Sequence, residues 1–450
     1  YAYNALTFLE YSRGIFYIGD IPTETMSPKS DEAGDVYQLE NWIANRETEQ
    51  LQYYFKYCYI AINRANTVID HIQNSSVLSE TARRRILGEA YFLRAWNYFN
   101  LVRTFGIVPV QTKMVAELSQ TTPPMATGLD QLYDLILGDL TRADNLLEVN
   151  KVFGRADKVA AQSLMAKAYL TIASSKEHNV HRYTEMRREP QIMYDSAAYW
   201  AGKVVRDYKN VYDFDTNLRD IYDVDKPTGP EHIFIMPIDR SGTQEGNYSK
   251  LPLLFLPSNN SVPFYIRYGN GDLQRANGNG WGVFLCNDEF VETQFSTTDK
   301  RRTELIHRDI YDASGNPIVP NQVKGYFSSK YVDPDFIGER TSARPYLIRF
   351  SDIALVYAEA AGPEAGLAYV NRIRERAGVT PLPSGMTTDK FREAVIKERA
   401  LELAFEGNRL YDLRRTASVT TTDIKAAGLS EAEAAYYPIP QREIDLNPNL

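Results

Sequence analysis

Three glutamates in the C-terminal quarter of the sequence have the spacing of residues that share one face of a helix. Glu398, Glu402 and Glu406 are four positions apart, so their Cβ atoms would lie roughly 5–6 Å apart along a helix. A retaining glycosidase holds its two carboxyl groups about 5–5.5 Å apart, so a hydrolytic pair is the first chemistry to consider. Glycosidase carboxyls, however, face each other across the substrate, whereas these follow one helix with Arg399 and Arg409 close by. The pattern favours a structural ion-pair network made by these five residues.

A second candidate site precedes the first long helix, where Trp42 and Asn45 are three positions apart and Tyr37 lies just upstream. A flat indole ring stacks on the C–H face of a sugar, and an amide hydrogen-bonds its hydroxyl groups. A tryptophan in this turn-rich segment is not needed to complete a helix face, which favours ligand contact; local packing is the alternative. Trp96 and Trp200 fall within helical segments and are predicted to be core residues.

The spacing of the residues argues against three other kinds of site. His178 and His181 are three positions apart but have no third metal ligand nearby, so a solvated loop is the better interpretation. Residues 213–217 resemble the start of an EF-hand loop, yet the sixth position is Leu218 where glycine is required. The glycines of 278–282 do not open a helix after a strand, as a dinucleotide-binding loop would. The sequence predicts no metal, no cofactor and no catalytic residue.

The elements that must position these residues are mostly helices. Apolar and small residues recur with a helical period over residues 48–73, 80–104, 128–147, 156–173, 195–208, 351–361, 364–377 and 389–406. Alanine and tyrosine at the expected helix contacts are typical of tetratricopeptide-like hairpins, although no strict 34-residue period is present. A short helix is expected after Gly407, and residues 437–450 are expected to be extended.

The segment between the two helical regions has a different composition. Proline, glycine, asparagine and serine recur every few residues across 225–345, with short strand-like apolar runs. We therefore expect a mainly all-α fold in three regions packed as one globular unit. These are a helical region over 1–224, an irregular loop-rich lobe over 225–345, and a second helical region with an extended tail over 346–450.

Length and charge limit the classes of function. The chain has 450 residues and a net charge of −8, which argues against binding to the nucleic-acid backbone. It also disfavours strongly anionic polysaccharides, although clustered arginines could override this locally, namely Arg182, Arg187, Arg188 or Arg267. No run of about 18 apolar residues predicts a membrane-spanning helix. The sequence starts at Tyr1 rather than methionine, so we expect an upstream signal or anchor to have been removed.

Several segments, taken in order, resemble the SusD/RagB family of outer-membrane nutrient-binding lipoproteins. The resemblance covers nearly the whole chain and rests on motifs that are weak singly but strong in this order. They are Ile62-Asn-Arg-Ala-Asn66, Glu89-Ala-Tyr-Phe-Leu-Arg-Ala through Pro109, Tyr346-Leu-Ile-Arg through Glu359, Val370 to Gly378, Glu398-Arg399 to Arg409 with Asp412-Leu-Arg414, and Pro438-Ile-Pro440 to Pro448.

The resemblance implies a SusD-like fold of four tetratricopeptide-like units with an irregular lobe. It implies a cell-surface glycan or nutrient binder that is not an enzyme and that captures oligosaccharide or polysaccharide. The implied partner is a SusC-like TonB-dependent outer-membrane transporter. The implied location is the outer membrane of a Gram-negative bacterium, reached through an N-terminal lipid anchor that this sequence lacks.

The family's binding residues vary with the ligand, but their usual locations are the loop before the first long repeat helix and the irregular lobe. Trp42, Asn45 and Tyr37 occupy the first location. Four further candidates occupy the second, namely Trp281, Tyr268, Tyr265 and Arg267. We expect an exposed aromatic platform made by Trp42 with Asn45, assisted by Tyr37 and by Trp281 or Tyr268.

Two other classes stay open on sequence alone. A helical-repeat scaffold for peptides or proteins would present a long concave groove lined by helix faces. A glycoside hydrolase would need two opposed carboxylates in a cleft, and the sequence offers no clear pair.

Overall fold

A computed structural model describes residues 1–29, 34–240, 249–318 and 325–450. These residues form seventeen α-helices and ten short strands, so the expectation of a mainly helical fold with an irregular lobe is confirmed. No helix in the described part of the chain is long and apolar enough to cross a membrane.

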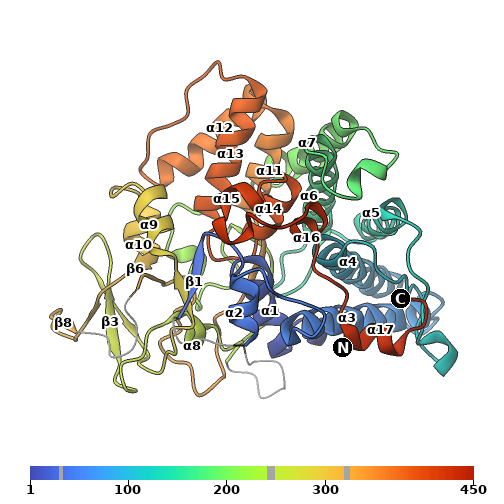
Figure 1. Ribbon diagram of the computed structural model, residues 1–450, viewed down its shortest axis with the longest axis horizontal. Helices are drawn as coiled ribbons and strands as arrows, with labels where there is room; N and C mark the ends of the chain where they lie inside the picture. The colour runs from blue at the N-terminus through green and yellow to red at the C-terminus, as the bar shows by residue number, and fades with distance from the viewer. Residues whose placement is uncertain (30–33, 241–248, 319–324) are drawn as a thin grey trace.

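The long helices form one continuous array in which each packs against the next. In packing order they are α3 (Glu49–Ile72), α4 (Glu80–Phe105), α5 (Leu129–Leu146), α6 (Lys158–Glu177), α7 (Pro190–Asp207), α11 (Phe350–Ala361), α12 (Pro363–Arg376) and α13 (Thr388–Glu402). The lobe is inserted between α7 and α11, which nevertheless pack on each other. Figure 1 shows the array curving around the shorter C-terminal helices.

Local sequence signals set the helix ends. Ser79 caps α4 by accepting a hydrogen bond from the backbone N–H of Ala82 at 3.3 Å. Gly106, at φ +75°, ends the same helix in a conformation that favours glycine. Between these ends α4 is buried on nearly every side, because it lies between α3 and α5 and touches α6.

The remaining helices are short. They are α1 (Leu9–Gly19), α2 (Asp35–Glu40), α8 (Leu251–Phe255), α9 (Asp288–Gln294), α10 (Lys300–Leu305), α14 (Arg409–Arg415), α15 (Val419–Thr422), α16 (Glu431–Ala435) and α17 (Gln441–Leu446).

The strands pair in small antiparallel groups. The two-stranded pairs are β1 (Met26–Pro28) with β5 (Phe284–Cys286), β2 (His232–Ile235) with β10 (Tyr346–Arg349), and β6 (Ile306–His307) with β9 (Phe327–Ser328). A four-stranded sheet has the order β4 (Leu273–Ala276), β3 (Phe264–Arg267), β7 (Ile310–Tyr311) and β8 (Pro317–Ile318). The β2–β10 pair joins the two ends of the lobe to the helical array.

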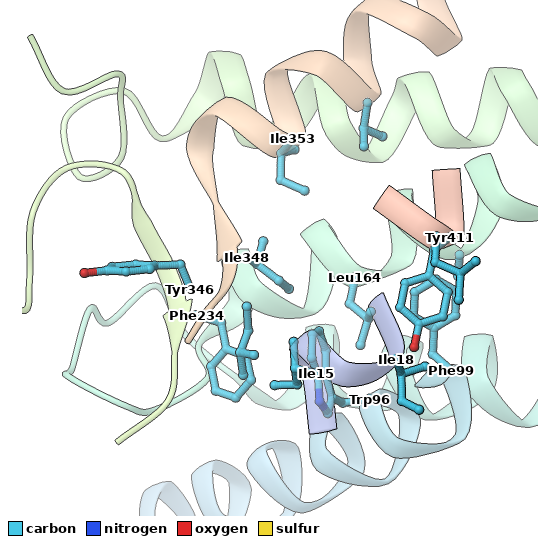
Figure 2. Packing of buried hydrophobic residues seen from close by; sticks show 14 of the residues in the cluster. Ile15, Ile18, Trp96, Phe99, Leu164, Phe234, Tyr346, Ile348, Ile353 and Tyr411 are labelled. Atoms are coloured by element: carbon cyan, nitrogen blue, oxygen red, sulfur yellow. The ribbon is translucent and has the colours of Figure 1, made fainter. Parts of the chain in front are cut away.

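The main core forms where α1 meets the array. Figure 2 shows Ile15 and Ile18 of α1 between Trp96 and Phe99 of α4 on one side and Leu164 of α6 on the other. Phe234 of β2 then packs edge-on against Trp96, with ring centroids 5.7 Å apart. Burial of this apolar surface ties the helices and the base of the lobe into one unit.

Three expected elements differ from the structure. Helix α7 begins at Pro190 rather than at residue 195, with the proline in the first turn. Helix α13 ends at Glu402 rather than at residue 406, because Phe405 and Gly407 adopt positive φ angles of 65° and 76° and turn the chain. The tail is not wholly extended, since α17 forms within it, and the backbone N–H of Gln441 donates to the carbonyl of Arg46 at 2.9 Å.

Candidate functional site

The glutamates of α13 belong to a buried ion-pair network rather than to an open pair of carboxylates. At its centre Arg349, 1% exposed, contacts Glu231 at 2.8 Å, Glu402 at 2.9 Å and Glu406 at 2.8 Å. Glu406 is brought there by the turn after α13, so it does not share the helix face with Glu402. Lys330 adds a second cation 2.6 Å from Glu406.

The network extends to both sides of Arg349. Arg376 contacts Glu231 and Glu402, and Arg301 bridges Glu398 at 2.5 Å and Asp299 at 2.8 Å. With Arg374 on Glu398 at 2.6 Å, five cations face five carboxylates. This balance explains how so many charges are accommodated inside the protein.

A neighbouring cluster holds the remaining charges of this region, with one exception. Arg399 lies 2.8 Å from Asp352 and 2.9 Å from Asp412, and it is buried. The structural role predicted for four of the five residues is supported by these contacts. Arg409 differs, because it lies at the edge of an open cleft and contacts Glu24 at 2.5 Å.

The buried carboxylates should make the protein lose stability in acid. Burial alone would raise the pKa of Glu231, but the guanidinium groups of Arg376 and Arg349 outweigh it and hold the pKa at about 2. The pKa of Glu406 is lowered in the same way by Arg349 and Lys330. The side chain of an unfolded glutamate has a pKa of about 4.3. The stabilisation is therefore complete above that pH, and the urea midpoint should fall steadily as the pH drops from about 5 towards 2.

A Glu231→Gln variant should show a smaller acid-induced loss than the parent protein, because it lacks one of the depressed groups. Asp20 responds in the opposite direction, since burial raises its pKa to about 7 and its contribution is lost as the pH rises towards that value. An Asp20→Asn variant should therefore retain the acid-induced loss. In the Asp20→Asn variant, a midpoint that stays constant between about pH 5 and about pH 2 would contradict this assignment.

The structure corrects the expectation for Trp42, which is buried rather than exposed on a platform. The residue is 8% exposed, and its indole Nε1–H donates to Asp423 at 3.1 Å. Its ring stacks on Tyr437 with the centroids 6.1 Å apart. The indole is therefore held by two residues of the C-terminal region, and local packing is the correct alternative for Trp42.

Asn45 is exposed but faces a different part of the surface. It lines a cleft of about 800 Å³ together with Tyr436 of the tail. Its side-chain oxygen accepts a hydrogen bond from the backbone N–H of Glu47 at 2.8 Å, so it shapes the turn before α3. The pairing of Trp42 and Asn45 as one ring-and-amide site is wrong.

Tyr37 and Trp281 do present their rings to solvent, being 52% and 44% exposed. Both residues lie in segments that adjoin the antiparallel pair of strands β1 and β5, which we call the β1–β5 ribbon. Its register continues to a hydrogen bond from Lys29 to Val283 at 3.1 Å, so the segments that carry the two rings leave the same end of the ribbon. Helix α2, which carries Tyr37, packs beside β1 (Figure 1).

The backbone that presents Trp281 is tightly fixed. The Trp281 N–H donates to the carbonyl of Leu253 at 2.6 Å, and the N–H of Gly282 donates to Leu256 at 2.9 Å. A Cβ on Gly280 would lie 2.0 Å from the carbonyl oxygen of Leu256, so only glycine fits there. The two flanking glycines therefore let the loop pack closely on α8 while the indole projects outwards.

A polar cleft of about 830 Å³ opens at the other end of the ribbon. The hydrogen-bonding side chains on its walls include Glu24, Ser27, Asn287, Gln294, Arg409 and Ser418. Three of its carboxylates are already paired, namely Glu24 with Arg409, Glu40 with Lys425 at 2.6 Å, and Asp423 with the indole of Trp42. The cleft therefore offers hydrogen-bond donors and acceptors to a polar ligand.

The other three lobe candidates, Tyr268, Tyr265 and Arg267, lie in two places. Tyr268 is 6% exposed and packs edge-on against His307, with centroids 5.5 Å apart, so it is not part of an exposed platform. Tyr265 and Arg267 lie on the outer face of the four-stranded sheet, where Arg267 is exposed. The single aromatic platform expected from the sequence is therefore not formed.

Strand pairing adds residues that sequence reasoning missed. Tyr311 and Arg275 are the register partners of Tyr265 on its two neighbouring strands. Lys250 lies over the exposed Trp281, with its Nζ 5.4 Å from the ring. None of these contacts has a local sequence signal, because each depends on segments that are distant in the chain.

The structure also shows the surroundings of the other tryptophans and of the two histidines considered as a metal pair. Trp96 is 5% exposed, as expected for the core, whereas Trp200 is only partly buried and lies under Lys203 at 5.2 Å. His178 lines the 830 Å³ cleft and His181 lines the 800 Å³ cleft, so the two imidazoles do not converge.

Two family models match this chain. Residues 309–450 match the model described as the SusD family, and residues 16–170 match one described as starch-binding associating with outer membrane. The SusD-like protein P2 of Formosa agariphila is 24% identical over 409 residues, which covers 84% of this chain and 74% of that protein.

Solved structures share the fold. A SusD homolog from Bacteroides thetaiotaomicron superposes with a TM-score of 0.80 at 20% identity, covering 100% of this chain and 94% of that one. Surface glycan-binding protein A from Bacteroides fluxus superposes with a TM-score of 0.76 at 20% identity, covering 99% and 94%. At these identities the likeness concerns the fold.

Proposed function

Because residues 309–450 match the SusD family model and residues 16–170 match the model described as starch-binding associating with outer membrane, we propose that the chain is a glycan-binding protein of the bacterial outer-membrane surface. In this proposal it captures oligosaccharides without cleaving them and delivers them to a SusC-like TonB-dependent transporter. A lipid anchor holds it at the cell surface. The related protein from Bacteroides fluxus is described as a surface glycan-binding protein, which supports the same ligand class here.

The observation that carries the proposal is the exposed indole of Trp281. Of the four tryptophans, all in the described part of the chain, it is the one that presents a large open ring, 44% exposed. The surrounding glycines fix the loop, so little conformational freedom is lost when a sugar stacks on the ring. Lys250 is held over the same ring by an ion pair with Glu339 at 2.6 Å, and its charge is close enough to contact the ligand.

The neighbouring cleft suits the remainder of an oligosaccharide. Its walls carry amides, hydroxyl groups and the Glu24–Arg409 pair, and sugar hydroxyls both donate to and accept from such groups. The absence of catalysis is proposed because three of the five carboxylates that line this cleft are bound to cations or to the indole of Trp42, namely Glu24, Glu40 and Asp423. We place Tyr37 of α2 at the edge of this binding surface. It lies at the same end of the β1–β5 ribbon as Trp281, whereas the cleft lies at the opposite end.

Replacing Trp281 with alanine should weaken glycan binding by about tenfold or more, because about 1.4 kcal/mol of lost stacking corresponds to tenfold. A glycan array identifies a ligand, and calorimetry with that ligand measures the change. The melting temperature should stay close to that of the parent protein, since nearly half of the Trp281 surface is already in solvent.

Tyr199 provides the matched control, because it is 55% exposed on α7, away from β1 (Figure 1). Tyr199→Ala should leave glycan affinity unchanged. Equal affinities for the Trp281→Ala variant and the parent would remove Trp281 from the site. Release of reducing ends from the bound oligosaccharide would contradict a non-catalytic role.

A further inference from the structure

The outer face of the four-stranded sheet carries a row of residues that the binding site described above does not use. Register pairs Arg275 with Tyr265 on one side, and Tyr265 with Tyr311 on the other. Directly paired cross-strand side chains have Cβ atoms about 4.5–5.5 Å apart. The two tyrosines are therefore direct neighbours on one flat surface, with an arginine at the end of the row.

The opposite face of the sheet is already occupied. Phe264, Ile266 and Ile310 are fully buried there in a small core of their own. Since strand side chains alternate between the two faces, the row with Tyr265 and Tyr311 points away from that core. Arg267, Leu273 and Arg275 on the outer face are exposed, so the described part of the chain leaves this face open.

Arg267 is the residue that gives this face a chemical preference. Its guanidinium lies 4.2 Å from the centroid of the Tyr311 ring and also donates to the carbonyl of Gly315. No carboxylate of the described residues forms an ion pair with it. The group is thus held in place while its remaining N–H donors and its positive charge stay unused.

We propose that this sheet face binds an acidic sugar unit, with the carboxylate of a hexuronate on Arg267 and the sugar ring against Tyr265 and Tyr311. A guanidinium binds a carboxylate through two parallel hydrogen bonds, and one already held by a ring and a carbonyl loses little freedom on doing so. The inference rests on the proposed glycan-binding function and adds a ligand class at a second surface.

Two of the other arginines named from the sequence are paired with carboxylates. Arg182 contacts Glu185 at 3.2 Å, and Arg188 contacts Asp130 and Asp134. Arg187 is exposed, but it lies in a loop before α7 rather than beside a tyrosine on a sheet face. Arg275 on the sheet itself lies 3.3 Å from Asp335. In a protein with a net charge of −8, Arg267 is therefore a local site where an anionic sugar is attracted rather than repelled.

Calorimetry with tetrasaccharides of galacturonate, mannuronate and guluronate, each beside its carboxyl-reduced neutral counterpart, tests the proposal. The full chain should bind at least one acidic tetrasaccharide more tightly than its neutral counterpart. Arg267→Gln should reduce the acidic affinity by about tenfold and leave the neutral affinity nearly unchanged. Added salt should weaken the acidic preference of the parent protein.

Arg308→Gln is the matched control, because Arg308 is also an exposed arginine over a tyrosine ring but lies near Asp288 and Glu292. This variant should retain the acidic preference. A preference that survives Arg267→Gln, or a parent protein that binds none of the acidic probes more tightly than the neutral ones, would overturn the sheet site. In both cases Trp281-dependent binding of a neutral glycan would show that the proposed function still holds.

Discussion

Replacing Arg349 with methionine should lower the free energy of unfolding by about 3–5 kcal/mol. Arg349 is 1% exposed and is the shared cation of Glu231, Glu402 and Glu406, each within 2.9 Å. Methionine fills much of the space of the arginine side chain. It leaves the three buried carboxylates with fewer cations than are needed to balance their negative charges. Urea unfolding followed by circular dichroism gives the free-energy difference directly.

The same reasoning applies to the anions, so Glu402→Ala should also cost several kcal/mol, because it leaves Arg349 and Arg376 with an unpaired charge. Arg308→Gln again serves as a control. Its ion pairs are exposed and long, at 3.5 and 3.6 Å, and such pairs contribute about 0–1 kcal/mol. An Arg349→Met variant no less stable than Arg308→Gln would show that the network is dispensable for stability.

Replacing Trp42 with alanine should cost a further large amount, about 3–5 kcal/mol. The substitution removes a buried ring that stacks on Tyr437. It also removes the indole N–H that donates a hydrogen bond to Asp423 at 3.1 Å. Thermal and urea unfolding should both show the loss. This expected result is the reverse of what a ligand-binding ring on an exposed loop would give.

Trp42→Phe separates the two contributions, because it keeps a ring against Tyr437 and removes only the N–H donor. Its cost should be about 1–3 kcal/mol, the typical penalty for leaving a buried polar group without its partner. If Trp42→Ala instead leaves stability intact and abolishes glycan binding, the residue is a ligand contact and the packing assignment is wrong.

Much of the fold could be predicted from the sequence, because local patterns carry the information. The apolar period predicted most of the long helices to within a few residues. The composition of the central segment likewise indicated an irregular lobe. The end of α13 was missed because a positive φ at a non-glycine residue such as Phe405 has no local sequence signal.

The candidate site was predicted less well, since exposure is not a local property. Trp42 and Trp281 both occur in turn-rich segments, yet one is buried and the other is half in solvent. The indole of Trp42 is covered by residues about 380 and 395 positions later in the chain, Asp423 and Tyr437. No window of sequence around Trp42 contains that information.

The sequence by itself determined the helical class, the irregular lobe and the charged composition of the C-terminal region. Only the tertiary structure decided which charges meet at Arg349, where Glu231 comes from a segment 118 residues away. It also decided that Tyr265 and Tyr311 lie side by side, through strand pairing between segments 46 residues apart. The physical reason is that helix formation depends on neighbours three or four positions apart, whereas burial and ion pairing depend on which distant segments come into contact.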